Sequence, residues 1–149
     1  MGTRSTITFK DKCGNKETTY VTIYQQYDGY IDGVGHDLAR WLLKKKIVNG
    51  FRYADDDMSD TANGLGCLAA QFIHDFKVEI GGLYITTNDD REDYNYFVLL
   101  DNSKLLETYD HEIAKANDCI TITVTNFDEE EPIFVGTPSE LLKFKEEEE

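Results

Sequence analysis

Residues 119–127 read Cys-Ile-Thr-Ile-Thr-Val-Thr-Asn-Phe and are the most regular stretch of the chain. Apolar side chains alternate with threonines, a period of two that is typical of a β-strand with one face against a core. A similar alternation over residues 3–9 predicts a strand, and the β-branched and aromatic residues at 18–26 predict a partner that returns through a turn at 11–15. We therefore expect a hairpin at the N-terminus and a long strand near the C-terminus.

Three segments have the pattern of helices. Residues from Gly35 to about Lys46 carry apolar side chains at helical spacing, and the lysines at the end complement the helix dipole. A second helix is expected from a cap at Ser59 or Asp60 to about Lys77. The sequence Thr-Pro-Ser-Glu at 137–140 is a capping box with proline at the first helical position, which predicts a short C-terminal helix.

Short strands account for most of the remaining chain. We expect them at 83–87, 94–100 and 104–109, and a brief edge strand at 133–135. The strands at 94–100 and 104–109 are predicted to form a hairpin around residues 101–103.

Strands and helices thus come in runs rather than in β-α-β alternation, which favours an α+β fold. We predict a single domain over residues 1–144, with a mainly antiparallel sheet of about five to six strands, two main helices packed on one face and a short C-terminal helix. Residues 145–149 are expected to form a disordered acidic tail.

The composition excludes several classes of protein. The chain has 149 residues, 40% of them hydrophobic, and a formal net charge of −14. Such a charge disfavours direct binding to nucleic acids and to anionic membranes. No apolar run reaches the ~20 residues of a spanning helix, and no secretory signal is evident. Because Cys13, Cys67 and Cys119 are odd in number and far apart, we expect free thiols and a cytoplasmic protein.

A polar and aromatic cluster follows the second predicted strand, where a glycine-rich loop leads into a helix. Backbone N–H groups at a helix N-terminus favour anions, tyrosine rings offer stacking faces, and glutamine offers paired hydrogen bonds. We expect a pocket for a small anionic, nucleotide-like ligand, lined by Arg4, Tyr24, Gln26, Tyr27, Asp28, Tyr30, Gly33, Gly35 and His36. In this hypothesis Arg4 and His36 supply positive charge, and the two glycines allow close approach of the backbone.

A structural explanation of the same cluster competes with this hypothesis. Arg4 can form an ion pair with Asp28 that fixes the loop, while the tyrosines fill the edge of the sheet. The pattern Gly33-x-Gly35 also lacks the third glycine of a dinucleotide-binding fingerprint.

Other candidate sites are weaker. Asp55-Asp56-Asp57 lies near Asp60, but a calcium loop that starts at Asp55 would need glycine at 60 and glutamate at 66, so no metal or other cofactor is predicted. Cys67 can be a nucleophile beside a histidine, or a small thiol packed in the core. Because no catalytic motif accompanies it, the sequence favours a protein that is not an enzyme.

Several motifs of the N-terminal half resemble those of a family of small, uncharacterised bacteriophage and mobile-element proteins. They are the opening Arg4-Ser5-Thr6 strand, the segment from Tyr24 to Tyr30 with its Tyr-x-x-x-Asp-Gly-Tyr pattern, and the two glycines that lead into a helix. The resemblance implies a viral or mobile-element origin, and hence a place in the host cytoplasm, but no reaction.

The leading hypothesis is a virus-type, non-enzymatic binding protein that sequesters a small anionic ligand and so interferes with a host system. One alternative is an acidic mimic of DNA that binds a basic host protein, since acidic runs recur along the chain. Another is a small hydrolase or transferase that uses Cys67 or acidic residues. Exposed strand edges such as 133–135 also favour pairing into a homo-oligomer.

Overall fold

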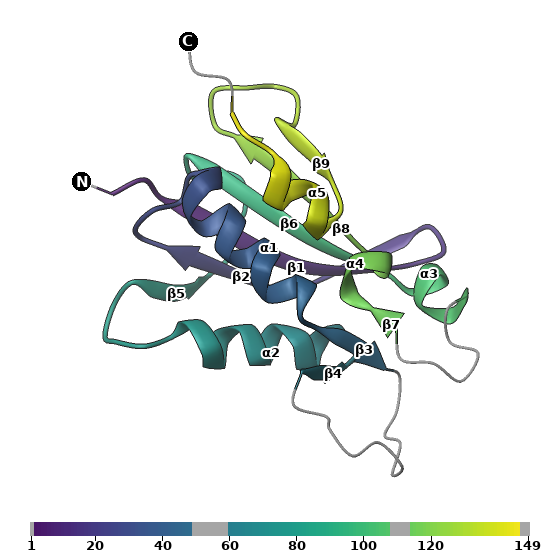
Figure 1. The fold of residues 1–149 in the computed structure, drawn as a ribbon. Helices are drawn as coiled ribbons and strands as arrows, with labels where there is room; N and C mark the ends of the chain where they lie inside the picture. The colour runs from purple at the N-terminus through teal and green to yellow at the C-terminus, as the bar shows by residue number, and fades with distance from the viewer. Residues whose placement is uncertain (1, 49–59, 108–113, 147–149) are drawn as a thin grey trace.

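A six-stranded mixed sheet is the centre of the fold (Figure 1). The computed structural model describes residues 2–48, 60–107 and 114–146, with the backbone alone at 106 and 107. The strands, in their order across the sheet, are β5 (Leu83–Thr86), β2 (Lys16–Gln25), β1 (Ser5–Cys13), β6 (Tyr94–Asp101), β8 (Ile120–Asn126) and β9 (Phe134–Gly136). Four of the five pairings are antiparallel, and β1 runs parallel to β6. The predicted α+β class is therefore confirmed.

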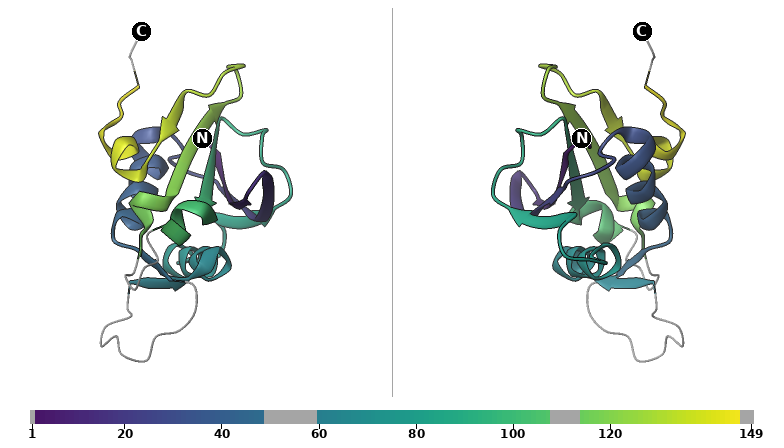
Figure 2. Two further views of the ribbon diagram at one scale, coloured as in Figure 1. Left: turned by 90° about the vertical axis from the view of Figure 1, so that its right-hand side faces the viewer. Right: turned by 90° about the vertical axis from the view of Figure 1, so that its left-hand side faces the viewer.

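The two main helices share one core with the sheet. They are α1 (His36–Leu43) and α2 (Gly64–Phe76). Phe72 of α2 lies 5.4 Å from Phe9 of β1 and 5.3 Å from Trp41 of α1, measured between ring centroids. Figure 2 shows α1 and the C-terminal helix α5 (Pro138–Lys143) side by side against the long strands.

Alternation along the strands explains which face is buried in this core. Ile7 and Phe9 of β1 and Ile23 of β2 are fully buried beneath the helices. The intervening threonines of β1 face the other side of the sheet and bond to their neighbours there. Thr6 donates to Asn95 Oδ1 at 2.7 Å, and the hydroxyls of Thr8 and Thr22 lie 3.1 Å apart.

The predicted strand at 104–109 is wrong, because residues Asn102–Glu107 form a short helix, α3. The Asp101 carboxylate accepts the Ser103 N–H at 3.0 Å, a local bond that turns the chain at the end of β6. β6 pairs with β1 and β8, and not in a hairpin with the segment that follows it. Residues 108 and 109 lie outside the described part of the chain.

A second, three-stranded sheet was not expected from the sequence. It consists of β4 (Thr61–Asn63), β3 (Lys46–Val48) and β7 (Ala114–Lys115), and β7 leads into the short helix α4 (Ala116–Cys119). The first helix therefore ends at Leu43 instead of Lys46. The second begins at Gly64, whose φ of 79° marks a break in the backbone, and not after a cap at residue 59 or 60.

The predicted C-terminal helix is confirmed, together with its cap. Thr137 accepts the Glu140 N–H at 3.2 Å through its hydroxyl, and donates its own N–H to Glu140 Oε1 at 3.0 Å. Among the described residues, none of the helices is long and apolar enough to cross a membrane.

Candidate functional site

Hydrogen bonds fix the segment that joins β2 to α1, including the π-helical turn η1 (Ile31–Gly35). The Tyr96 hydroxyl of β6 donates to the Gly29 carbonyl at 2.7 Å, and the Gly29 N–H donates to the Thr3 carbonyl at 2.9 Å. Asp28 adopts a left-handed backbone with a φ of 59°, and its carbonyl accepts the Val34 N–H at 2.8 Å. The segment is thus tied both to the central strand and to the N-terminal residues.

Gly33, Gly35 and His36 have partners inside the chain. A Cβ on Gly33 would overlap a backbone carbonyl of the same loop, and one on Gly35 would lie 3.1 Å from the Tyr96 hydroxyl. His36 Nε2 forms a hydrogen bond of 3.1 Å with the carbonyl of Phe144, after α5. The absence of a side chain at Gly33 and Gly35 therefore allows the loop to pack closely on itself and on the sheet. The hydrogen bond of His36 connects α1 to the C-terminal segment.

The other predicted side chains divide between two places. The Tyr24 ring packs against Tyr84 of β5, with centroids 5.9 Å apart, on the sheet face opposite the helices. Tyr27 and Tyr30 are exposed on the loop, and the Gln26 N–H donates to a carbonyl before β5. The structure does not gather these residues into one pocket with Arg4 and His36.

The ion pair proposed between Arg4 and Asp28 is not formed. Asp28 Oδ1 accepts the Tyr30 hydroxyl at 3.3 Å, and the negative charge of Asp28 raises the pKa of Tyr30. Arg4 is exposed, and its guanidinium makes no ion pair with any residue in the described ranges. Its backbone N–H donates to Asp93 Oδ2 at 3.3 Å.

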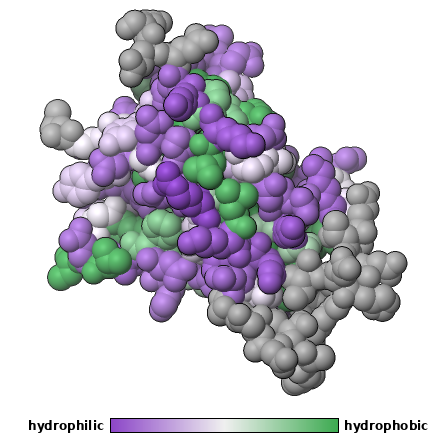
Figure 3. Space-filling model, in the orientation of Figure 1, coloured by the Kyte–Doolittle hydropathy of each residue, from purple (hydrophilic) through white to green (hydrophobic). Residues whose placement is uncertain are grey.

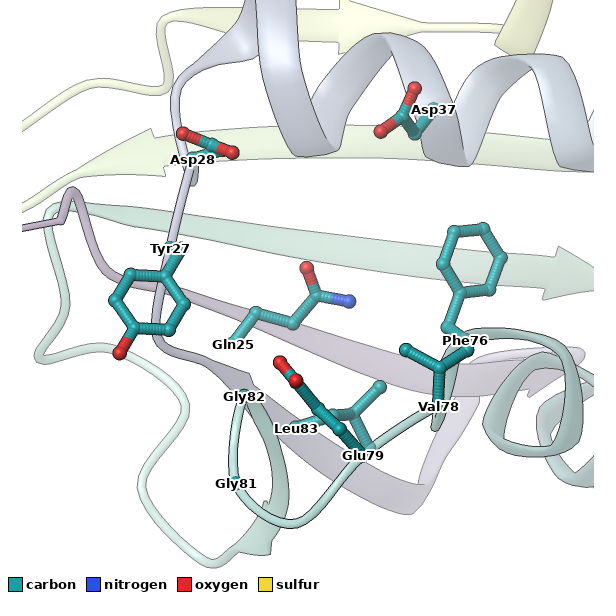
Figure 4. Close-up of a pocket in the computed structure, with 10 residues that line it drawn as sticks. All are labelled: Gln25, Tyr27, Asp28, Asp37, Phe76, Val78, Glu79, Gly81, Gly82 and Leu83. Atoms are coloured by element: carbon teal, nitrogen blue, oxygen red, sulfur yellow. The ribbon is translucent and has the colours of Figure 1, made fainter.

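A first hollow, of about 360 Å³, lies between the start of α1 and the loop that joins α2 to β5 (Figure 4). We call it the acidic hollow; its lining is Gln25, Tyr27, Asp28, Asp37, Phe76, Val78, Glu79, Gly81, Gly82 and Leu83. Figure 4 shows the carboxylates of Asp28 and Asp37 on one side, Glu79 on the other and Gln25 between them. Its charge suits a cation, although Tyr27 and Asp28 were predicted to contact an anion.

A second hollow, of about 380 Å³, lies beside the N-terminal segment. We call it the arginine hollow; its lining is Gly2, Arg4, Arg91, Glu92, Asp93 and Phe127. Like Arg4, Arg91 makes no ion pair within the described part of the chain. The Phe127 ring is 65% exposed, and a Cβ on Gly2 would lie 2.7 Å from Tyr27 Cδ1, which places Tyr27 next to this hollow as well.

Of the residues that line this hollow, the sequence analysis named Arg4 and did not name Arg91 or Phe127. The parallel pairing of β1 with β6 brings Arg91 close to Arg4, since Ser5 is opposite Tyr94 and the Tyr94 N–H donates to the Arg4 carbonyl at 3.3 Å. The antiparallel pairing of β6 with β8 brings Phe127 to the same place, where its N–H donates to the Asp93 carbonyl at 3.4 Å. No local pattern in the sequence predicts a parallel pairing between two strands that lie so far apart in the chain.

The thiols do not form a catalytic arrangement in the described residues. Cys67 Sγ lies 3.6 Å from Gln71 Nε2, and no histidine is hydrogen-bonded to it there. Cys119 is buried, and burial raises its pKa to about 12. In the same residues no group of three or more His, Cys, Asp or Glu side chains could hold a metal ion, and Asp55, Asp56 and Asp57 lie outside them.

Comparison with known proteins finds no family model, no curated protein and no solved structure that matches this chain.

Proposed function

We propose that the chain is a non-enzymatic binding protein for a small anionic, nucleotide-like ligand, and that the arginine hollow is its binding site. The observation that carries the proposal is the pair Arg4 and Arg91, which line one hollow without an ion pair to any described residue. A guanidinium has a planar fork of donors that matches phosphate and carboxylate oxygens.

Aromatic rings at the same hollow support a ligand that also has a planar, apolar part. Phe127 is 65% exposed at the rim, and Tyr27, 55% exposed, lies against Gly2. A base stacked on such a ring contributes about 1–3 kcal/mol. Glu92 and Asp93 line the same hollow and balance the two arginines, so it is neutral in a chain of net charge −14. A neutral hollow selects ligands of small charge, such as a monophosphate, over polyanions.

The resemblance to bacteriophage proteins extends this proposal to a role. A protein that binds such a ligand without consuming it lowers its free concentration, and so deprives a host system that depends on it. The proposal keeps Arg4 and Tyr27 from the predicted set. It assigns Gly33, Gly35 and His36 to the framework, on account of their contacts inside the chain.

Isothermal titration calorimetry tests the proposal with a panel of 5′-mononucleotides, cyclic mono- and dinucleotides, and inorganic phosphate. We expect heat from at least one nucleotide. Arg4→Ala and Arg91→Ala are each expected to weaken its binding by at least about tenfold, because hydrogen bonds to charged groups contribute about 1.5–3 kcal/mol. Arg40→Ala is the matched control, since Arg40 is an exposed arginine of α1 that bonds to Asp37. Folded protein that gives no heat with any member of the panel would refute the proposal.

A further inference from the structure

Exposed apolar side chains gather next to the acidic hollow. Val78 is 83% exposed, Ile80 is fully exposed and Ile85 is 68% exposed. Figure 3 shows a hydrophobic patch over the loop between α2 and β5. We call Val78, Ile80 and Ile85 the 78–85 patch; Tyr84, between them in sequence, faces the other side of the sheet against Tyr24. Large apolar side chains that cluster on a surface commonly mark a place where another molecule binds.

The loop that carries the patch is braced in its exposed conformation. Gly81 and Gly82 have φ values of 84° and 76°, a conformation that only glycine adopts readily. The Lys77 ammonium donates to the carbonyls of Gly81 and Leu83, at 2.9 Å in each case. The apolar side chains are therefore presented outward by a defined backbone.

The patch continues onto a free sheet edge. β5 pairs with β2 on one side, and no described strand pairs with it on the other. The Gly82 carbonyl accepts the N–H of Gln26, the residue after β2, and carbonyls alternate in direction along a strand, so those of Leu83 and Ile85 face the free edge. The Leu83 carbonyl already accepts a hydrogen bond from the Lys77 ammonium. The Ile85 carbonyl is therefore the one that can accept a hydrogen bond from an incoming chain.

The charge beside the patch decides what kind of chain fits. Asp28 and Glu79 make no ion pair with a described residue, and Asp37 bonds to Arg40 at 3.2 Å. Phe76 and Leu83 give the same hollow an apolar wall. Such a wall suits the methylene stem of a basic side chain, and the carboxylates suit its charged head.

We propose that the 78–85 patch and the acidic hollow form one docking surface for a basic, apolar segment of a partner protein. Apolar side chains of the segment cover Val78 and Ile80, and an arginine or lysine enters the hollow between Asp28, Asp37 and Glu79. A second copy of the chain is a poor occupant, because two molecules of net charge −14 repel each other.

Nuclear magnetic resonance of the ¹⁵N-labelled full chain tests this proposal with three synthetic six-residue peptides: alternating Arg-Val, alternating Glu-Val and alternating Arg-Ser. The Arg-Val peptide is expected to shift the amides of residues 76–86 and 25–28. Ile80→Ser is expected to weaken its binding by at least about tenfold, because the docked peptide buries the isoleucine side chain, which is fully exposed in the free protein. Glu79→Gln is expected to weaken binding and to reduce its dependence on salt.

Val135→Ser is the matched control, since Val135 is 60% exposed on β9, at the opposite edge of the same sheet. It is expected to leave binding of the Arg-Val peptide unchanged. The proposal is overturned if that peptide does not bind, if either other peptide binds as tightly, or if the shifts map elsewhere. Amide shifts that depend on protein concentration alone would make a second copy the occupant and would also overturn it. Failure of nucleotide binding leaves the test intact, because Arg4 and Arg91 are not part of this surface.

Discussion

Removal of the Tyr96 hydroxyl tests how the loop after β2 is attached to the sheet. Tyr96 is fully buried on β6, and its hydroxyl donates to the Gly29 carbonyl at 2.7 Å. In Tyr96→Phe the ring keeps its packing, but the buried carbonyl loses its donor. An unsatisfied buried group costs about 1–3 kcal/mol, so we expect the free energy of unfolding to fall by about 2 kcal/mol. For a chain of this size, such a loss lowers the midpoint temperature of thermal unfolding by about 4–8 °C.

Urea denaturation followed by circular dichroism and by the fluorescence of Trp41 measures this change. Tyr94→Phe is the matched control, because the Tyr94 hydroxyl lies 3.0 Å from Glu146 Oε2 near the C-terminus. We expect the control to lose less than about 0.5 kcal/mol, as is usual for a change at an exposed bond. Equal losses in the two variants, or no loss in Tyr96→Phe, would refute the argument that this bond anchors the loop.

Three further predictions concern other parts of the molecule. Gly29→Ala is expected to lower the free energy of unfolding by about 1–3 kcal/mol, because its Cβ would lie 2.9 Å from the backbone of the N-terminal segment. Gly66→Ala is expected to raise the free energy of unfolding by about 0.5–1 kcal/mol, since Gly66 is an exposed helical residue with space around it. Urea denaturation measures both changes. In the native protein at neutral pH a maleimide is expected to modify the exposed Cys13 and to leave Cys119 unmodified, because burial blocks access to Cys119 and raises its pKa to about 12. Mass spectrometry identifies the modified cysteines. Modification of Cys119 at the same rate as Cys13 would contradict the buried position of Cys119. Hydrogen bonds from Trp41 and His74 lower the pKa of Asp75, so this carboxylate stabilises the fold above about pH 4 and ceases to do so as the pH falls through its lowered pKa. In Asp75→Asn the free energy of unfolding is expected to fall less steeply with decreasing pH below about pH 4. An unchanged pH dependence in the variant would contradict this role of Asp75.

Local patterns account for much of the fold. The alternation in 119–127 corresponds to β8, and the capping box at Thr137 and Glu140 forms as predicted. The strand predicted at 104–109 is wrong because the chain forms α3 there, and the Asp101 carboxylate accepts the Ser103 N–H at the start of this helix. The three-residue strands β3 and β4 are too short to show a period, and they pair with each other only in the folded chain.

The candidate site was predictable only in part, because it depends on contacts between distant segments. Arg4 and Tyr27 belong to motifs that can be seen in the sequence, whereas Arg91 lies in the turn before β6 and reaches Arg4 through parallel pairing. Gly33 and Gly35 were predicted to allow close approach of the backbone to a ligand. Their neighbours, however, are groups of the chain itself, and composition does not distinguish the two cases.

The most direct test of the proposed binding site follows the side-chain Nε–Hε resonances of the arginines while nucleotide is added to the ¹⁵N-labelled protein. We predict that the resonances of Arg4 and Arg91 shift together along one saturable curve, while that of Arg40 stays in place. Shifts at Arg40 alone, or no shift at Arg4 and Arg91 at saturating nucleotide, would contradict the assignment of the arginine hollow as an anion site.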